Sequence, residues 1–466
     1  MLNYFLMPHP PIIIPEVGKG AENKVINTVN ACKAVGEKID NLDAETIIII
    51  SPHGVVFRDA IAMVTSNYLK GDLGKFGAAE VSFNYEIDLE LTNKIINCAK
   101  ESNVLVANLD EKTTPRYSVP LELDHGAIVP LYYADKSRNH KLVHITYGLL
   151  SPTELLKFGL AIKRAVREIN KKAVLIASGD LSHRLTRDGP YDYTPLGATF
   201  DNTLIDILSS GNLKELFNIE KRLINEAGEC GLRSLYILAG AINTTTIKSK
   251  LLSYEGPLGV GYGTLEFKEG EGNLYEDIIK DKKNEHKRRL SEGNQYTKLA
   301  RANLDRYFNE GRLITIDELT DNSLLDHKKG VFVSLKINGE LRGCIGTIKP
   351  TTSCVGEEII RNSLSAALDD PRFQPLKKDE LIDIDISVDL LYPAESTLFD
   401  ELDPLDYGVI VTCGDKRGLL LPNIEGIDTK EQQVEIAMSK GNISLSDTYT
   451  LERFKVERFK ELDNDE

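Results

Sequence analysis

Two segments of the chain are continuously apolar and end in small polar residues and a histidine. These are IIIISPHG at 47–54 and VLIASGDLSH at 174–183. Apolar runs rich in β-branched residues and without polar alternation are typical of strands covered on both faces, as in a parallel sheet flanked by helices. Pro52 has no amide hydrogen and ends the first strand. The pattern predicts two buried strands with a histidine beyond each carboxyl end, where open α/β sheets bind ligands.

Other segments of the first 268 residues alternate between strand-like and helical patterns. SPTE at 151–154 is a capping box, with Ser151 as N-cap and Glu154 three residues later. Further strands are expected at 3–7, 60–66, 141–149 and 248–268, and helices at 20–39, 86–101, 151–170 and 198–243. We therefore expect an α/β domain over 1–268, with a mixed, largely buried central sheet flanked by helices.

A highly charged segment at 269–295 separates this region from a second domain. It has no clean apolar stripe, so it is interpreted as a linker or an exposed helix. The following segment, 330–348, predicts a hairpin that turns at Asn338-Gly339. A helix at 354–368, a strand at 383–391 and a second hairpin around 414–422 follow. This mixture predicts an α+β domain over 296–462.

Composition limits the function classes. The 466 residues carry a net charge of −15, which argues against binding nucleic acid through bulk charge. The six cysteines include no CxxC pair and fit free thiols in a reducing cytoplasm, where we expect the protein to be located. The N-terminal segment lacks the basic start of a secretory signal, and no run of about 18 apolar residues predicts a membrane span.

Histidines are concentrated in the first domain. Six of the eight lie before residue 184, and His9, His53, His125 and His183 adjoin Pro, Gly, Asp or Ser at predicted strand ends or sharp breaks. Histidine serves both as a metal ligand and as a proton-transfer group near neutral pH. The cluster predicts a metal site at a sheet edge. The other two are interpreted as structural, His140 in an exposed loop and His144 as a satisfied strand residue.

Several motifs together resemble known families. MPHPPI, IIIISPHG, ELDHGAIVPL, IASGDLSH and EAGECGL are similar to the class III extradiol ring-cleavage dioxygenases of the protocatechuate 4,5-dioxygenase type and to their relatives, the Memo proteins. LRGCIG, AALDDPRF, ISVDLL and GLLLP resemble the AMMECR-type domain. A fusion of the two is similar to the AmmeMemoRadiSam set, which implies a radical-SAM protein as partner.

The dioxygenase resemblance implies a non-haem Fe(II) site held by two histidines and one glutamate, with positions left for a catechol-like substrate and O2. By motif the metal ligands are His9, His53 and Glu229, the last chosen over Glu226. His183 matches the acid/base histidine of the family, and His125 matches a further catalytic-pocket histidine. The implied activity is extradiol-type dioxygenation of a small aromatic or diol-like substrate.

Alternatives remain open at two places. Memo-type relatives have a cysteine near the third ligand, so Cys230 is a second candidate beside Glu229, although a buried inert thiol is its simpler interpretation. The corresponding alternative function is a metal-binding or scaffold protein without ring cleavage. Asp124 or Asp180 is expected to orient a histidine.

The LRGCIG motif gives no clear chemistry. Arg342 is a candidate anion ligand, whereas Gly343 and Gly346 are expected to form a tight bend with Cys344 packed in the core rather than acting as a nucleophile.

Overall fold

The computed structural model describes residues 2–325, 327–337, 339–424 and 426–461. The chain divides into two compact units, one ending at Ile279 and one beginning at Lys280. The predicted N-terminal domain lies within the first unit. The predicted end of the second domain at 462 lies outside the described residues.

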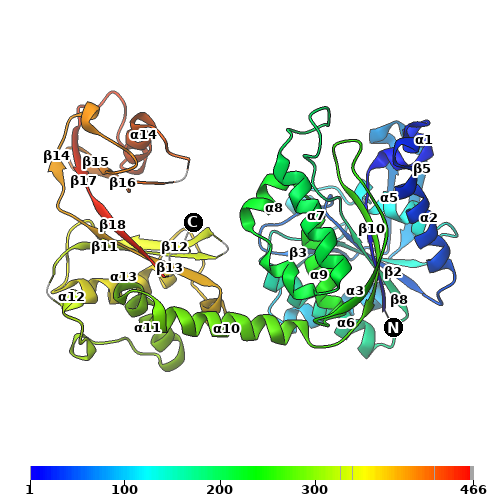
Figure 1. The fold of residues 1–466 in the computed structure, drawn as a ribbon, viewed down its shortest axis with the longest axis horizontal. Helices are drawn as coiled ribbons and strands as arrows, with labels where there is room; N and C mark the ends of the chain where they lie inside the picture. Colours follow the sequence, from blue (N-terminus) through cyan, green and yellow to red (C-terminus); the bar gives the residue numbers. More distant parts are fainter. Residues whose placement is uncertain (1, 326, 338, 425, 462–466) are drawn as a thin grey trace. The chain divides into compact units, whose positions relative to one another are not determined.

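The N-terminal unit is built on one eight-stranded mixed sheet (Figure 1). The strand order is β6-β3-β7-β2-β8-β1-β10-β9, and β1, β2, β7 and β8 run parallel to one another. The strands are β1 (Leu2–Met7), β2 (Thr46–Ser51), β3 (Ile61–Val64), β6 (Val106–Leu109), β7 (Lys141–Thr146), β8 (Ala173–Ser178), β9 (Ile247–Glu255) and β10 (Tyr262–Glu269). The predicted mixed α/β class with a buried central sheet is confirmed.

Helices cover both faces of this sheet and explain the run of isoleucines. Ile48 and Ile50 pack in one apolar core and Ile47 and Ile49 in the other, because successive side chains of a strand point to opposite faces. The first core includes α3 (Leu89–Glu101), α6 (Pro152–Glu168), α7 (Pro195–Ser210) and α9 (Leu232–Ile242); the second includes α2 (Ile26–Asp40) and α5 (His125–Ala134). None of the described helices has the length and apolar composition to cross a membrane.

Local signals set several element ends. The predicted capping box forms at the start of α6, where Ser151 accepts from the backbone of Glu154 and the Glu154 carboxylate accepts from the backbone of Ser151. The side chain of Asp88 accepts from Leu91 N, so α3 begins at Leu89 rather than at the expected residue 86. The sequence pattern missed β6 and the hairpin of β4 (Tyr68–Leu73) and β5 (Ala78–Glu86). Short helices α1 (Pro15–Gly18), α4 (Thr114–Tyr117) and α8 (Lys221–Ala227) complete the unit.

The charged segment between the predicted domains is helical. Helix α10 spans Leu274–Glu292, and only Leu274 and Ile278 of it are buried, which explains the weak apolar stripe. From its middle onward, Lys282 pairs with Asp383, and Arg289 donates to Ile384 O at 2.8 Å. Polar contacts rather than apolar packing therefore hold this half of the helix.

The C-terminal unit contains two four-stranded sheets. The first, in the order β12-β11-β13-β18, packs on α11 (Gln295–Glu310) and α13 (Val355–Leu368). Its strands are β11 (Gly330–Ile337), β12 (Glu340–Gly346), β13 (Ile384–Leu391) and β18 (Val456–Lys460). The second is formed by β14 (Glu395–Ser396), β17 (Thr450–Phe454), β15 (Gly408–Cys413) and β16 (Lys416–Leu420), and packs on α14 (Lys430–Lys440). The short helix α12 covers Asn322–Leu325. The predicted α+β class is confirmed.

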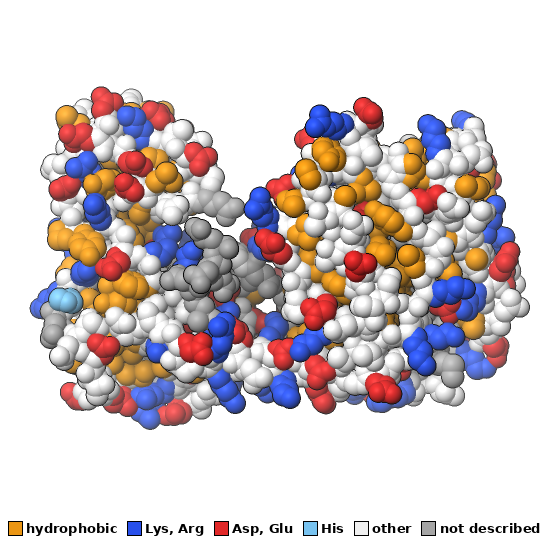
Figure 2. Space-filling model, viewed as in Figure 1, with side chains coloured by type: hydrophobic (Ala, Val, Ile, Leu, Met, Phe, Trp, Pro, Cys, Tyr) orange, Lys and Arg blue, Asp and Glu red, His pale blue; other side chains and the backbone are white. Residues whose placement is uncertain are grey.

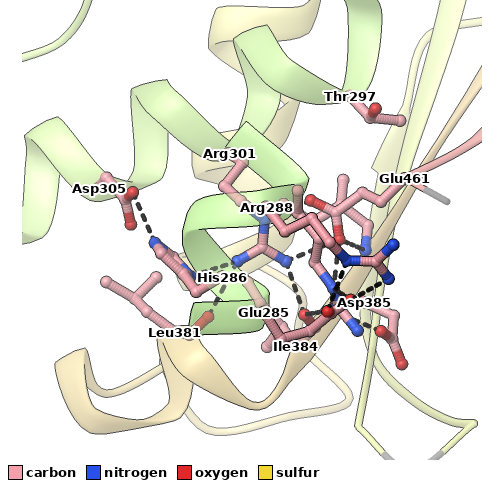
Figure 3. A network of polar contacts seen from close by, with 12 residues as sticks. Glu285, His286, Arg288, Thr297, Arg301, Asp305, Leu381, Ile384, Asp385 and Glu461 are labelled. Atoms are coloured by element: carbon pink, nitrogen blue, oxygen red, sulfur yellow. Dashed lines mark hydrogen bonds and ion pairs between the residues drawn. The ribbon is translucent and has the colours of Figure 1, made fainter. Parts of the chain in front are cut away.

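A buried arginine of α11 joins α10 to Glu461, the residue that follows the last strand, β18 (Figure 3). Arg301 is 1% exposed, and its Nη2 donates to Glu461 Oε2 at 2.6 Å and to Ile384 O at 2.6 Å. Its Nε donates to Glu461 Oε1, and its Nη1 donates to Leu381 O at 3.0 Å and to His286 Nδ1 at 2.8 Å. All five guanidinium hydrogens therefore have an acceptor.

The LRGCIG motif is a strand and not the expected bend. It forms most of β12, which pairs antiparallel with β11 as the predicted hairpin requires, although Asn338 lies outside the described residues. A Cβ on Gly343 would lie 2.1 Å from Ala366 O, so this glycine lets α13 approach the strand. Cys344 is only partly buried and accepts from Ser334 Oγ at 3.2 Å, so the expected core packing is wrong. Arg342 pairs with Glu380 at 2.8 Å.

Candidate metal centre

Three parallel strands bring the predicted histidines to one edge of the sheet. Strands β1, β2 and β8 end at Met7, Ser51 and Ser178, and the segments after them carry His9, His53 and His183. His125 is the first residue of α5, whose N-cap is Asp124. Carboxyl ends of parallel strands share one edge, so residues distant in sequence meet there.

Three of these histidines form a group that suits a metal ion. Ligand nitrogens of His9, His53 and His125 all lie within 4.8 Å of one another. His9 Nε2 is 2.9 Å from His53 Nε2, and the rings of His53 and His125 stack at 4.3 Å between centroids. His9 is buried, whereas His53 is exposed, so the group lies at the surface end of the sheet.

The electrostatics keep these rings neutral. Burial lowers the pKa of His9 well below its ordinary value, and the neighbouring His53 lowers it further. Burial, His53 and His9 lower the pKa of His125 to about 4, and burial lowers the pKa of His53 and of His183. Neutral imidazole is the form that binds metals, because each ring keeps one nitrogen lone pair.

The spacing of the two closest nitrogens agrees with a metal site. Two nitrogens each about 2.0–2.1 Å from one metal ion lie about 2.9 Å apart at a right angle and about 3.3 Å apart at a tetrahedral angle. The His9–His53 separation of 2.9 Å lies near this range and is also the length of an ordinary hydrogen bond between the two rings.

The two candidates for a further ligand point in different directions. The Glu229 carboxylate accepts from Leu232 N at 2.6 Å, at the start of α9, and neither Glu229 nor Cys230 belongs to the group of three histidines. Burial raises the pKa of Glu229 despite this hydrogen bond. Cys230 Sγ instead lies 3.6 Å from His9 Nε2. Glu229 as a ligand stays a prediction, and Cys230 is the residue whose donor atom lies against the histidines.

His183 lies on the other side of Cys230. Its Nε2 is 3.6 Å from Cys230 Sγ, and its ring stacks on Tyr191 at 5.0 Å between centroids. Tyr191 belongs to the loop 184–193, which lines a surface hollow that also includes Arg184 and Arg187. The predicted acid/base histidine therefore lies between the metal-ligand group and an open, polar loop.

Two aspartates support the site. Asp180 Oδ1 accepts from His9 N at 2.9 Å, and burial raises the pKa of Asp180 to about 6. Asp124 accepts from Ser51 Oγ and from His144 Nε2, the latter at 2.9 Å. Burial alone would raise the pKa of Asp124, but the hydrogen bond from His144 holds it far below the ordinary value.

Sequence reasoning missed the position of His144 in this network. The side chain lies in β7 beside β2, and its Nδ1 is buried with no hydrogen-bond partner in the described chain. The available signal was the parallel pairing of two apolar strands, which places His144 opposite Ile49, four residues before His53. His140 is partly buried and bonds to Asp135 at 2.8 Å, away from the group of three histidines.

Comparison with known proteins agrees with this architecture. The family profile described as the catalytic LigB subunit of aromatic ring-opening dioxygenase matches residues 3–264. The chain belongs to the LigB family. A second profile, AMMECR1, matches residues 297–461, so the LigB part is fused to an AMMECR1 part, as predicted.

Curated proteins of similar sequence match nearly the whole chain or about a third of it. A protein of Clostridium acetobutylicum is 45% identical over 462 residues, which cover 98% of this chain and 99% of the relative. A Thermotoga maritima protein is 46% identical over 168 residues, 35% of this chain and 97% of that protein. A solved structure of an uncharacterized Escherichia coli K12 protein covers 57% of this chain and 99% of its own, with 14% identity and a TM-score of 0.39.

Proposed function

We propose that the N-terminal unit binds one transition metal ion at His9, His53 and His125 and acts as a metal-dependent oxidoreductase. The observation that carries this proposal is the group of three neutral imidazoles at the carboxyl edge of the sheet, whose ligand nitrogens all lie within 4.8 Å of one another. Fe(II) is the metal that we propose, because a small set of imidazole donors with further open positions suits non-haem iron.

The proposed reaction is extradiol-type dioxygenation of a small aromatic or diol-like substrate with O2. A ferrous ion would acidify a bound diol and supply electrons to O2. The lowered pKa of His183, which burial causes, leaves this ring neutral near pH 7. His183 is thus able to accept a proton from a substrate hydroxyl and to return it later. His125, whose ring stacks on His53, is the third member of the proposed ligand group.

A second candidate function is metal binding without ring cleavage. It is favoured by the thiol of Cys230 beside His9, together with the engagement of the Glu229 carboxylate at the start of α9. Thiolate is a softer ligand than carboxylate and shifts the preference away from a ferrous oxygenase. A radical-SAM partner is proposed for either function, and co-purification of tagged full-length protein with such an enzyme tests it.

One experiment separates the two functions. Full-length protein is loaded anaerobically with Fe(II), and oxygen uptake is measured over a panel of catechols and aminophenols. Dioxygenation predicts substrate-dependent uptake in the wild type and none in His53→Ala. Stoichiometric metal binding without uptake on any substrate supports the second function. Absence of metal binding contradicts both.

The C-terminal unit adds no support for a nucleic-acid function. Basic and acidic side chains are interspersed over the face of each unit drawn in Figure 2. Sequence-independent binding of nucleic acid requires a cluster of Lys and Arg. The acidic net charge of −15 agrees with this picture.

A further inference from the structure

A buried serine contacts the most enclosed ligand of the proposed site. Ser178 is the last residue of β8 and is 0% exposed. Its Oγ lies 3.0 Å from His9 Nδ1 and also within hydrogen-bond distance of Gly126 O. The hydroxyl therefore joins the histidine that follows β1 to the first turn of α5.

These two contacts determine where the hydrogens are. A carbonyl oxygen only accepts, so the single hydroxyl hydrogen of Ser178 points to Gly126 O. The hydrogen between Ser178 and His9 must then come from the ring, so His9 Nδ1 donates to Ser178 Oγ. A neutral imidazole carries one N–H. Nε2 of His9 is consequently bare, with its lone pair directed at His53.

His53 has the opposite arrangement. Two bare nitrogens 2.9 Å apart would repel each other, so with no metal ion between them His53 Nε2 carries a hydrogen and donates it to His9 Nε2. His53 Nδ1 has no hydrogen-bond partner in the described parts of the chain, and the residue is exposed. His53 Nδ1 is thus open to water and able to carry the hydrogen in place of Nε2.

We infer that Ser178 is a positioning residue that presets His9 as a metal ligand, and that metal binding moves the His53 hydrogen from Nε2 to Nδ1. His9 then needs no rearrangement, whereas His53 exchanges its bond to His9 for a bond to the metal. No proton is gained or lost in this exchange, because both rings stay neutral. The inference rests on the proposed metal centre and adds that one ligand, His9, is preset whereas another, His53, must rearrange.

The first test observes the hydrogens directly. Full-length protein labelled with 15N-histidine is studied by NMR at neutral pH, before and after addition of Zn(II) as a diamagnetic probe, with His9→Gln and His53→Gln used for assignment. The expected result without metal is Nδ1–H on His9 and Nε2–H on His53. Addition of Zn(II) is expected to change the tautomer of His53 and to leave that of His9 unchanged. Nε2–H on His9 without metal, or an unchanged tautomer of metal-bound His53, overturns the inference.

The second test removes the hydroxyl. Loss of a residue that orients a metal-binding histidine typically weakens metal affinity about 10–100-fold. We expect that loss in Zn(II) affinity for Ser178→Ala, and recovery of most of it in Ser178→Thr, which keeps the hydroxyl.

Ser182→Ala is the matched control, because Ser182 is equally buried and donates to a backbone carbonyl, Ala227 O, at 3.1 Å. Equal affinity in Ser178→Ala and Ser182→Ala contradicts a positioning role. Because neither test uses Fe(II) or O2, failure of the proposed oxidoreductase activity leaves both outcomes interpretable.

Discussion

The buried Arg301–Glu461 pair of the C-terminal unit gives a stability prediction that is independent of the metal site. The Glu461→Gln substitution keeps the shape of the side chain but removes the charge opposite a guanidinium that is 1% exposed. Breaking a buried ion pair by removing one partner costs about 3–5 kcal/mol, because the remaining charge is left uncompensated in the interior. The substituted side chain also turns an NH2 group toward Arg301 or toward Ile386 N, which donates to Glu461 Oε2 at 2.8 Å.

That free energy converts to a measurable thermal shift. For a unit of about 150–250 residues, each kcal/mol moves Tm by about 2–4 °C, so we expect Tm of the C-terminal transition to fall by about 6–20 °C. Differential scanning calorimetry of the full-length protein measures the transition. The transition of the N-terminal unit, which has its own core, serves as an internal reference.

The matched control is Glu457→Gln in β18, the strand that ends one residue before Glu461. The Glu457 side chain is 49% exposed and lies 3.9 Å from Lys329, so its loss should change stability by no more than about 0.5 kcal/mol. If Tm falls no more in Glu461→Gln than in this control, the buried Arg301–Glu461 pair does not stabilise the unit as expected.

Three further outcomes follow from single side chains. Burial raises the pKa of Asp201 to about 7, so its stabilising contribution is present below about pH 3.8 and lost as the pH rises through 7. In urea unfolding, the stability of Asp201→Asn should therefore rise relative to that of the wild type over this pH range. Parallel pH profiles of the two proteins would contradict this expectation. Gly343→Ala should destabilise the C-terminal unit by about 1–3 kcal/mol in urea, because the new methyl group would collide with Ala366 O. An unchanged urea midpoint would show that α13 moves away from the strand at no cost in stability. His144→Leu removes the donor to Asp124 and should weaken Zn(II) affinity about 10-fold in titration, whereas His140→Asn should not.

Sequence patterns predicted the parts of the fold that depend on local rules. Four consecutive isoleucines favoured a strand covered on both faces, and Ile47 and Ile48 do lie in opposite cores. The capping box at Ser151 fixed the start of α6 because its hydrogen bonds are all within four residues. The weak stripe of α10 left a linker and an exposed helix as alternatives, because polar contacts such as Arg289 to Ile384 O replace apolar packing there.

The part of the site that could be predicted is the part that lies directly after the ends of parallel strands. Parallel strands place His9 and His53 at one edge whatever the loops do, and the two nitrogens lie 2.9 Å apart. Which of Glu229 and Cys230 faces them depends on the turn before α9, which no pattern in EAGECGL specifies. The role of His144 needed the pairing of β7 with β2, because its partner Asp124 is 20 residues away in the chain.

Metal titration tests the central claim most directly. Anaerobic full-length protein is titrated with Fe(II), and the bound equivalents are compared among the wild type, His53→Ala, Cys230→Ser and Glu229→Gln. The account predicts one equivalent in the wild type, loss of binding in His53→Ala, and a larger loss in Cys230→Ser than in Glu229→Gln, since Cys230 Sγ lies 3.6 Å from His9. Binding that is absent in the wild type, or unchanged in His53→Ala, would contradict the account.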